Sequence, residues 1–234
     1  MRVLYQSLRY YKLNRDRGKV FKMSVNDVKK YKGIITALIT PINRDLSINS
    51  DSLRTLIDLQ VESGIIGFFV LGTYGEGVAI HPEKRKRFLE KVAEYSPSNI
   101  LLINNVSSTS LETSLELVKH SADVGVHNVA SLPPFYYKVT AKEVREFYRE
   151  LARQDCNLFI YNNPGKTGFD VTPRILDEIA RENPSLVGIK DSSGRLDRLI
   201  ELTERFINRL YVAIASDSFI LDAFLYGADA HICG

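Results

Sequence analysis

The chain has 234 residues, of which 44% are hydrophobic and 25% charged, with a formal net charge of +3. This is the composition of an ordinary globular protein, and the length suffices for one large domain with a sizeable core. No run approaches the ~18 apolar residues of a membrane span. The two cysteines, Cys156 and Cys233, make no disulfide framework. We therefore expect a reduced, cytoplasmic protein with no membrane partner.

The positive charge is concentrated at the N-terminus. Residues 1–32 contain ten Lys and Arg against two Asp. No glycine-aromatic repeat, amphipathic period or signal-peptide core accompanies this charge. We therefore favour a frayed extension or a mis-assigned start over a nucleic-acid-binding arm, and Met23 would make a natural start. The prediction is a basic extension over 1–32 followed by one domain over 33–234.

From residue 33 the chain alternates apolar, β-rich runs with helical patterns. Eight runs are predicted as strands: Gly33–Thr40, Ile66–Leu71, Ile100–Asn105, Asn128–Leu132, Leu158–Asn162, Leu186–Lys190, Tyr211–Ser216 and Ala230–Gly234. Between them lie helical patterns, several of which begin with good caps at Ser110, Thr140 and Thr172. Eight βα units predict a closed (β/α)₈ TIM barrel. An open doubly wound sheet would show fewer strands and a Gly-x-Gly-x-x-Gly turn after the first, which is absent.

The predicted barrel stops early in this sequence. Gly234 is both the last residue and the expected end of the eighth strand. We expect a barrel truncated after that strand, without its last helix or a C-terminal helical domain.

The first candidate for chemistry is Lys190, which ends a short buried strand and precedes the loop Asp191–Gly194. A lysine at this place keeps its stem in the core and its amine at the rim of a cleft. Because burial disfavours the ammonium form, such an amine can be neutral and nucleophilic near pH 7, as Schiff-base chemistry requires. A lysine that snorkels to solvent gives the same local pattern.

Polar residues follow other strands as well. The loop Leu71–Gly77 contains three glycines, whose freedom lets backbone N–H groups turn toward an anion such as a carboxylate. Tyr161 ends the fifth strand, where its phenol is either a proton donor beside Lys190 or a core tyrosine. The ends of a barrel's strands meet at one face, so these groups are expected to converge.

Other kinds of site are excluded. Gly165-Lys166-Thr167 is not a phosphate loop, because Ile160 stands where that motif needs its first glycine. The four histidines are scattered without metal-ligand spacing, and no Gly-x-Ser-x-Gly elbow is present. We therefore expect no metal site, no nucleotide site and no hydrolase triad.

Five motifs in order resemble the dihydrodipicolinate synthase/N-acetylneuraminate lyase family of class I aldolases. The resemblance covers roughly residues 31–234. The motifs are Gly33–Pro41, Gly72–Glu76, Pro134–Tyr137, Tyr161–Gly168 and Gly188–Gly194. Each is weak alone, but their joint order and spacing make chance agreement improbable.

The resemblance implies a role for several residues. Lys190 would form the Schiff base with pyruvate or another 2-oxo acid, and Tyr161 would donate and accept the proton. Thr73 would link Tyr161 to Tyr136 in a proton relay, with Tyr136 reaching in from a neighbouring subunit. A homo-oligomer, dimer or tetramer, is implied, as are a 2-oxo acid and an aldehyde as partners, without metal or cofactor.

The resemblance also implies a substrate-binding set. The backbone amides of Thr73 and Tyr74 would hold the pyruvate carboxylate, and Ile232 matches a backbone position that contacts pyruvate. Tyr74 replaces the family's usual second Ser or Thr. Lys166 stands where the biosynthetic synthases usually have an arginine, and a lysine cannot reproduce its bidentate geometry.

The sequence therefore predicts a Schiff-base lyase or aldolase acting on pyruvate or a 2-oxo acid, of the 2-keto-3-deoxy-sugar-acid type. Two alternatives stay open. One is 4-hydroxy-tetrahydrodipicolinate synthase, which joins pyruvate to aspartate semialdehyde in lysine biosynthesis. The other is a non-catalytic homologue that binds a 2-oxo acid without turnover.

Overall fold

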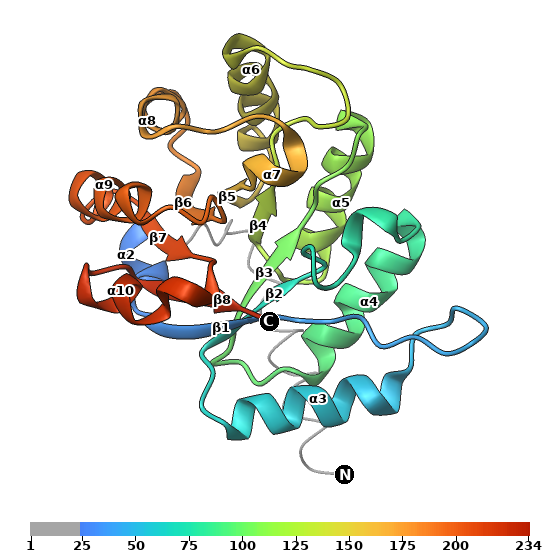
Figure 1. Ribbon diagram of the computed structural model, residues 1–234. Coiled ribbons are helices and arrows are strands. Elements are labelled where there is room, and N and C mark those ends of the chain that lie inside the picture. The colour runs from blue at the N-terminus through green and yellow to red at the C-terminus, as the bar shows by residue number, and fades with distance from the viewer. Residues whose placement is uncertain (1–23) are drawn as a thin grey trace.

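The computed structural model describes residues 24–234, and in this part the chain forms a closed barrel of eight parallel strands. The strands are β1 (Gly33–Ala37), β2 (Gly67–Val70), β3 (Leu101–Asn105), β4 (Asn128–Ser131), β5 (Asn157–Asn162), β6 (Leu186–Asp191), β7 (Tyr211–Ile214) and β8 (Ala230–Cys233). Each strand pairs with the next, and β8 pairs with β1 to close the ring (Figure 1). The predicted TIM-barrel fold is confirmed, and every predicted strand overlaps an observed one.

Helices surround the barrel (Figure 1). They are α2 (Val25–Val28), α3 (Ser50–Glu62), α4 (Pro82–Tyr95), α5 (Leu111–Asp123), α6 (Ala141–Ala152), α7 (Pro164–Thr167), α8 (Pro173–Glu182), α9 (Leu196–Phe206) and α10 (Ile220–Leu225). The three predicted caps are confirmed: the side chains of Ser110, Thr140 and Thr172 accept hydrogen bonds from the first turns of α5, α6 and α8.

The strands are apolar on both faces because one face packs inside the barrel and the other packs against the surrounding helices. Phe68 and Phe69 are neighbours in β2, and both are fully buried. Successive side chains of a strand point to opposite faces. Phe69 accordingly packs inside the barrel with Tyr161 and Ile232, whereas Phe68 packs outside in the layer formed with α3 and α4. A parallel barrel therefore reads as continuous hydrophobic runs, which is why the strands stood out in the sequence.

The predicted basic extension overlaps the described residues only at 24–32. There Ser24 and Asp27 form a capping box at the start of α2, and Val28 is fully buried. Lys29 Nζ lies 2.7 Å from the carboxylate of Asp229, just before β8. This short part of the extension is thus folded against the N-terminal end of the barrel. Residues 1–23 lie outside the described residues.

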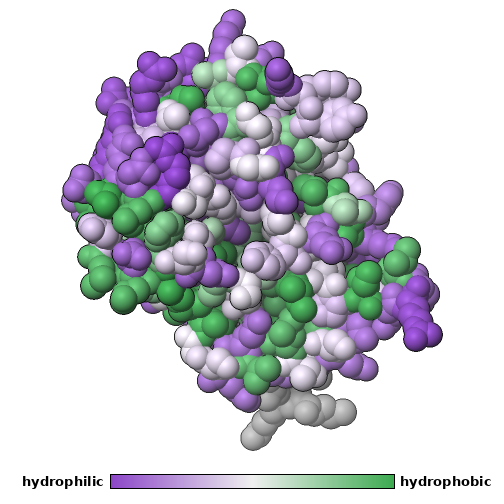
Figure 2. Space-filling model, viewed as in Figure 1, coloured by the Kyte–Doolittle hydropathy of each residue, from purple (hydrophilic) through white to green (hydrophobic). Residues whose placement is uncertain are grey.

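The outer surface near β8 is apolar. Leu221 and Leu225 of α10 are 68% and 72% exposed, and Figure 2 shows hydrophobic side chains gathered over this helix. Within residues 24–234, no helix has both the length and the hydropathy that a membrane crossing needs.

Candidate active site

Lys190 lies near the C-terminal end of β6, with its side chain inside the mouth of the barrel. The residue is 4% exposed. Its Nζ lies 3.8 Å from the centroid of the Phe69 ring and 4.4 Å from that of the Tyr161 ring. Burial lowers the pKa of Lys190 from its ordinary 10.5 to about 7. Since no carboxylate of the described residues pairs with it, a substantial fraction of this amine is neutral at physiological pH.

Two glycines make room for this arrangement. A Cβ on Gly72 would lie 2.7 Å from the Phe69 ring and 4.0 Å from Lys190 Nζ. A Cβ on Gly188 would lie 2.5 Å from the Phe159 ring, in the layer below. A side chain at Gly72 would displace the Phe69 ring that lies beside the lysine, and one at Gly188 would displace the Phe159 ring.

Tyr161 is the second-last residue of β5 and lies beside Lys190, with which it is paired in register. Its ring is 2% exposed and packs edge to face on Phe69, with centroids 5.2 Å apart. Its hydroxyl lies 2.8 Å from Thr73 Oγ1. The side-chain amide of Asn163 donates to the same hydroxyl at 3.3 Å. The phenol is therefore held by two side chains from different loops, next to the amine.

The loop after β2 that carries Thr73 is tightly folded. Leu71 and Glu76 adopt left-handed backbone conformations, with φ of 58° and 52°, which are strained for residues other than glycine. A Cβ on Gly77 would lie 1.8 Å from the carbonyl oxygen of Leu71, so only glycine fits there. Within residues 24–234 no group accepts a hydrogen bond from the backbone N–H of Thr73 or Tyr74. These two donors are free to bind an anion at the mouth.

Of the remaining predicted site residues, one is buried in the barrel and three are exposed. Ile232 is buried in the barrel interior with Tyr161 and Phe69. Tyr74 is 59% exposed, and its ring lies over Gly234 at the end of β8. Lys166 is exposed in α7, directly after the strand that carries Tyr161. Tyr136 is 83% exposed and packs on Tyr137 rather than on Thr73, so within one chain the expected relay does not reach Tyr136.

The structure therefore brings together Lys190, Tyr161, Thr73 and the amides of the β2 loop. Two further members of this group were missed in the sequence. Phe69 sits in an apolar run and carries no signal that separates it from ordinary core residues. Asn163 carried a signal, because it lies two residues after Tyr161 at the end of β5, and alternate residues of an extended chain point to the same side.

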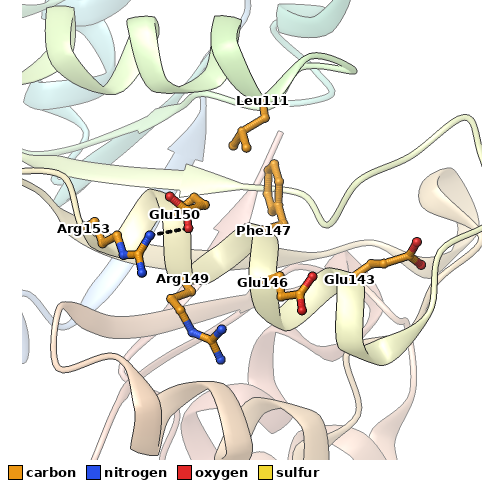
Figure 3. A pocket seen from close by; sticks show the side chains of 7 residues that line it. All are labelled: Leu111, Glu143, Glu146, Phe147, Arg149, Glu150 and Arg153. Atoms are coloured by element: carbon orange, nitrogen blue, oxygen red, sulfur yellow. Dashed lines mark hydrogen bonds and ion pairs between the residues drawn. The ribbon is translucent and has the colours of Figure 1, made fainter.

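Neither of two hollows contains Lys190, Tyr161 or Thr73, although Tyr74 lines the one beside the β2 loop. The other lies over α6, where carboxylates and guanidinium groups line it together with two apolar side chains, and Arg153 pairs with Glu150 across one turn (Figure 3). Its lining residues are Leu111, Glu143, Glu146, Phe147, Arg149, Glu150 and Arg153. Among residues 24–234, no three His, Cys, Asp or Glu side chains are grouped as a metal site would require.

The chain is similar to several known proteins. It is 28% identical over 209 residues to the probable 2-dehydro-3-deoxy-D-pentonate aldolase YjhH of Escherichia coli K12, covering 88% of this chain and 69% of the relative. It is 32% identical over 204 residues to an N-acetylneuraminate lyase of Rhizobium meliloti, covering 87% and 67%.

Solved structures agree with this similarity. A dihydrodipicolinate synthase from Acinetobacter baumannii, crystallised in complex with pyruvate, superposes with a TM-score of 0.82 at 28% identity, over 86% of this chain and 69% of that one. The model of the dihydrodipicolinate synthetase family matches residues 30–234. The chain therefore belongs to the dihydrodipicolinate synthetase family, as its strand-end motifs indicated.

Proposed function

We propose that this protein is a pyruvate-dependent lyase or aldolase that works through an imine on Lys190. The observation that carries the proposal is the buried, unpaired amine of Lys190, with a pKa of about 7, beside a phenol that is hydrogen-bonded to Thr73. A neutral amine attacks a ketone carbon, whereas an ammonium ion cannot. The pyruvate complex of the Acinetobacter relative supports the choice of ligand.

The proposed reaction starts with attack of Lys190 Nζ on the keto carbon of pyruvate. The resulting carbinolamine loses water to give a protonated imine, which draws electrons from the neighbouring methyl group when that group releases a proton. The enamine so formed adds to the carbonyl carbon of an aldehyde, and water then releases the product from the lysine. Cleavage follows the same steps in reverse.

Tyr161 is the proposed acid and base. Its hydroxyl would give a proton to the departing carbinolamine oxygen and, later, to the aldehyde oxygen as the new bond forms. The hydrogen bond to Thr73 fixes the direction of that hydroxyl. Completion of the relay by Tyr136 would require a second subunit, which we propose as the reason for its exposure.

The carboxylate of pyruvate would bind the free amides of Thr73 and Tyr74, close to Ile232 on β8. This places the keto carbon toward Lys190 and the methyl group toward the open mouth. The exposed ammonium of Lys166 would meet an anionic or hydroxylated end of the aldehyde.

The aldehyde decides between the two catalytic alternatives. Because Lys166 offers a single point charge in place of a bidentate guanidinium, we favour cleavage of a 2-keto-3-deoxy sugar acid over the synthase reaction. Pyruvate should be incubated with a panel of sugar-derived aldehydes and, separately, with aspartate semialdehyde. Condensation with a sugar-derived aldehyde supports the aldolase, whereas product from aspartate semialdehyde alone supports the synthase.

Exchange of the methyl protons of pyruvate distinguishes a protein that only binds 2-oxo acids from the aldolase and from the synthase. An imine that equilibrates with its enamine replaces the methyl protons of pyruvate by deuterium in D₂O, which proton NMR follows without knowledge of the aldehyde. Binding of pyruvate without exchange would identify a non-catalytic homologue.

A further inference from the structure

A buried polar cluster at the C-terminal end of β3 lies outside the proposed chemistry. It consists of Arg85 from α4 with Asn105 and Ser107, which are 3%, 2% and 0% exposed; we call it the Arg85 cluster. Arg85 donates to the backbone carbonyls of Asn105 at 2.6 Å and Ser107 at 2.8 Å. Its two terminal nitrogens thus hold the chain at both sides of Val106.

Burial of the Arg85 side chain at this position is energetically unfavourable. Burial lowers its pKa to about 10, and among the described residues no carboxylate forms an ion pair with it. A buried charge without a counter-charge destabilises a fold unless its hydrogen bonds are well made. The planar fork of a guanidinium suits two carbonyls separated by one residue, which a lysine cannot hold together. The geometry of the loop after β3 is therefore what this arginine maintains.

The side chains of the cluster extend to the neighbouring strands. Asn105 Nδ2 donates to the carbonyl of Leu71 at 2.7 Å, and Ser107 Oγ donates to Asn105 Oδ1 at 2.6 Å. The same Ser107 oxygen accepts from the backbone N–H of Leu132 at 2.7 Å. One connected network thus joins the C-terminal ends of β2, β3 and β4.

The contact with Leu71 links this network to the proposed active site. Leu71 has a φ of 58°, a conformation that is strained for residues other than glycine and persists only where its surroundings enforce it. Its carbonyl is buried against Gly77 and accepts the hydrogen bond from the side-chain amide of Asn105. Thr73, which holds the Tyr161 hydroxyl, follows two residues later.

We infer that the Arg85 cluster positions the Thr73 loop, so that Arg85, Asn105 and Ser107 govern proton transfer by Tyr161 without touching substrate. This inference rests on the proposed function. Loss of the hydrogen bond from Asn105 Nδ2 to the Leu71 carbonyl lets the strained peptide relax and moves Thr73 Oγ1 away from Tyr161. Displacements of ~1 Å near reacting groups cost about a hundredfold in rate.

Two serines supply a matched test. Ser107 and Ser121 are both fully buried, and each donates one 2.6 Å hydrogen bond, Ser107 to Asn105 and Ser121 to the carbonyl of Val126 at the other end of the barrel. In Ser107→Ala we expect deuterium exchange into pyruvate to fall about ten- to a hundredfold. In Ser121→Ala we expect the wild-type rate. If Ser107→Ala does not fold, Asn105→Asp replaces it in the test. This variant keeps the acceptor for Ser107 but loses the donor to Leu71, so we expect a similar fall in deuterium exchange.

The second readout is coupling to Thr73. If the cluster acts through Thr73, Ser107→Ala causes no further fall in the exchange rate once Thr73 is replaced by Val. If the two residues act independently, the double variant shows the product of the two single fold-changes. Equal rates for the Ser107 and Ser121 variants, or multiplied effects with Thr73→Val, would overturn the inference. Absence of exchange in the wild-type protein would instead overturn the proposed function.

Discussion

Lys190 Nζ lies 3.8 Å from the centroid of the Phe69 ring, and the two residues belong to strands on different sides of the barrel. The contact matters because the proposed intermediate is a cation. A protonated imine on Nζ would lie against the electron-rich face of Phe69 with little water around it, where cation–π attraction reaches about 2 kcal/mol. Desolvation disfavours charge on the free amine, while the ring favours charge on the imine at the same atom.

Replacement of Phe69 tests this relationship. In Phe69→Leu the imine loses the aromatic face, so we expect the apparent dissociation constant of pyruvate, measured by borohydride trapping, to rise roughly 10- to 30-fold. Phe68→Leu is the control, because Phe68 is equally buried in the same strand but faces the helices. Equal changes in the two variants would mean that the ring contributes only packing.

The rate of imine formation should follow the titration of a lysine with a pKa of about 7. Attack requires the neutral amine, so the rate falls about tenfold per pH unit below 7 and levels off above 8. A profile that still rises between pH 8 and 10 would show an ordinary lysine. The measurement is the initial rate of borohydride-trapped adduct at saturating pyruvate across pH 5–10.

The stability of the fold should depend on the same group. The folded protein releases the Lys190 proton near pH 7, whereas the unfolded chain keeps it to about 10.5. The unfolded state therefore binds more protons in that window, and stability rises with pH across it. Lys190→Met removes the cost of the buried charge, so it should stabilise the protein by roughly 3–5 kcal/mol below pH 7 and by little near pH 10. Urea unfolding of both proteins at pH 6.5 and 9.5 measures the difference, and a gain independent of pH would contradict this origin.

Removal of one hydroxyl tests the role of Tyr161. In Tyr161→Phe we expect deuterium exchange into pyruvate to fall by about 10²–10⁴, with the ring packing on Phe69 retained. The matched variant is Tyr211→Phe, a buried barrel tyrosine whose hydroxyl donates to the carbonyl of Tyr31 at 2.6 Å, at the far end of the barrel. That change should cost about 1 kcal/mol of stability and leave exchange unaltered. Similar exchange rates in the two variants would remove Tyr161 from the mechanism.

Much of this architecture could be predicted from the sequence because local patterns and the fold agree. Double burial makes every strand a continuous apolar run, and side chains such as Thr140 mark the helix starts, so the barrel and its strand ends were foreseeable. Because strand ends converge on one face of a barrel, the sequence also predicts that Lys190 and Tyr161 lie close together.

The rest depended on contacts between distant segments. Nothing in the apolar run Gly67–Val70 distinguishes Phe69, whose role follows from which face of β2 meets Lys190 across the barrel. The left-handed conformation of Leu71 is equally invisible, since leucine gives no sign of it and the enforcing groups lie 14 and 34 residues away, at Arg85 and Asn105.

The most direct test of the account is the site of covalent capture. The protein should be reduced with borohydride in the presence of pyruvate, digested, and mapped by mass spectrometry, with a Lys190→Arg variant treated in parallel. We predict one reduced pyruvate adduct, on the peptide that contains Lys190, and none in the variant. An unmodified Lys190 in folded wild-type protein, or an equal adduct in the variant, would contradict the account.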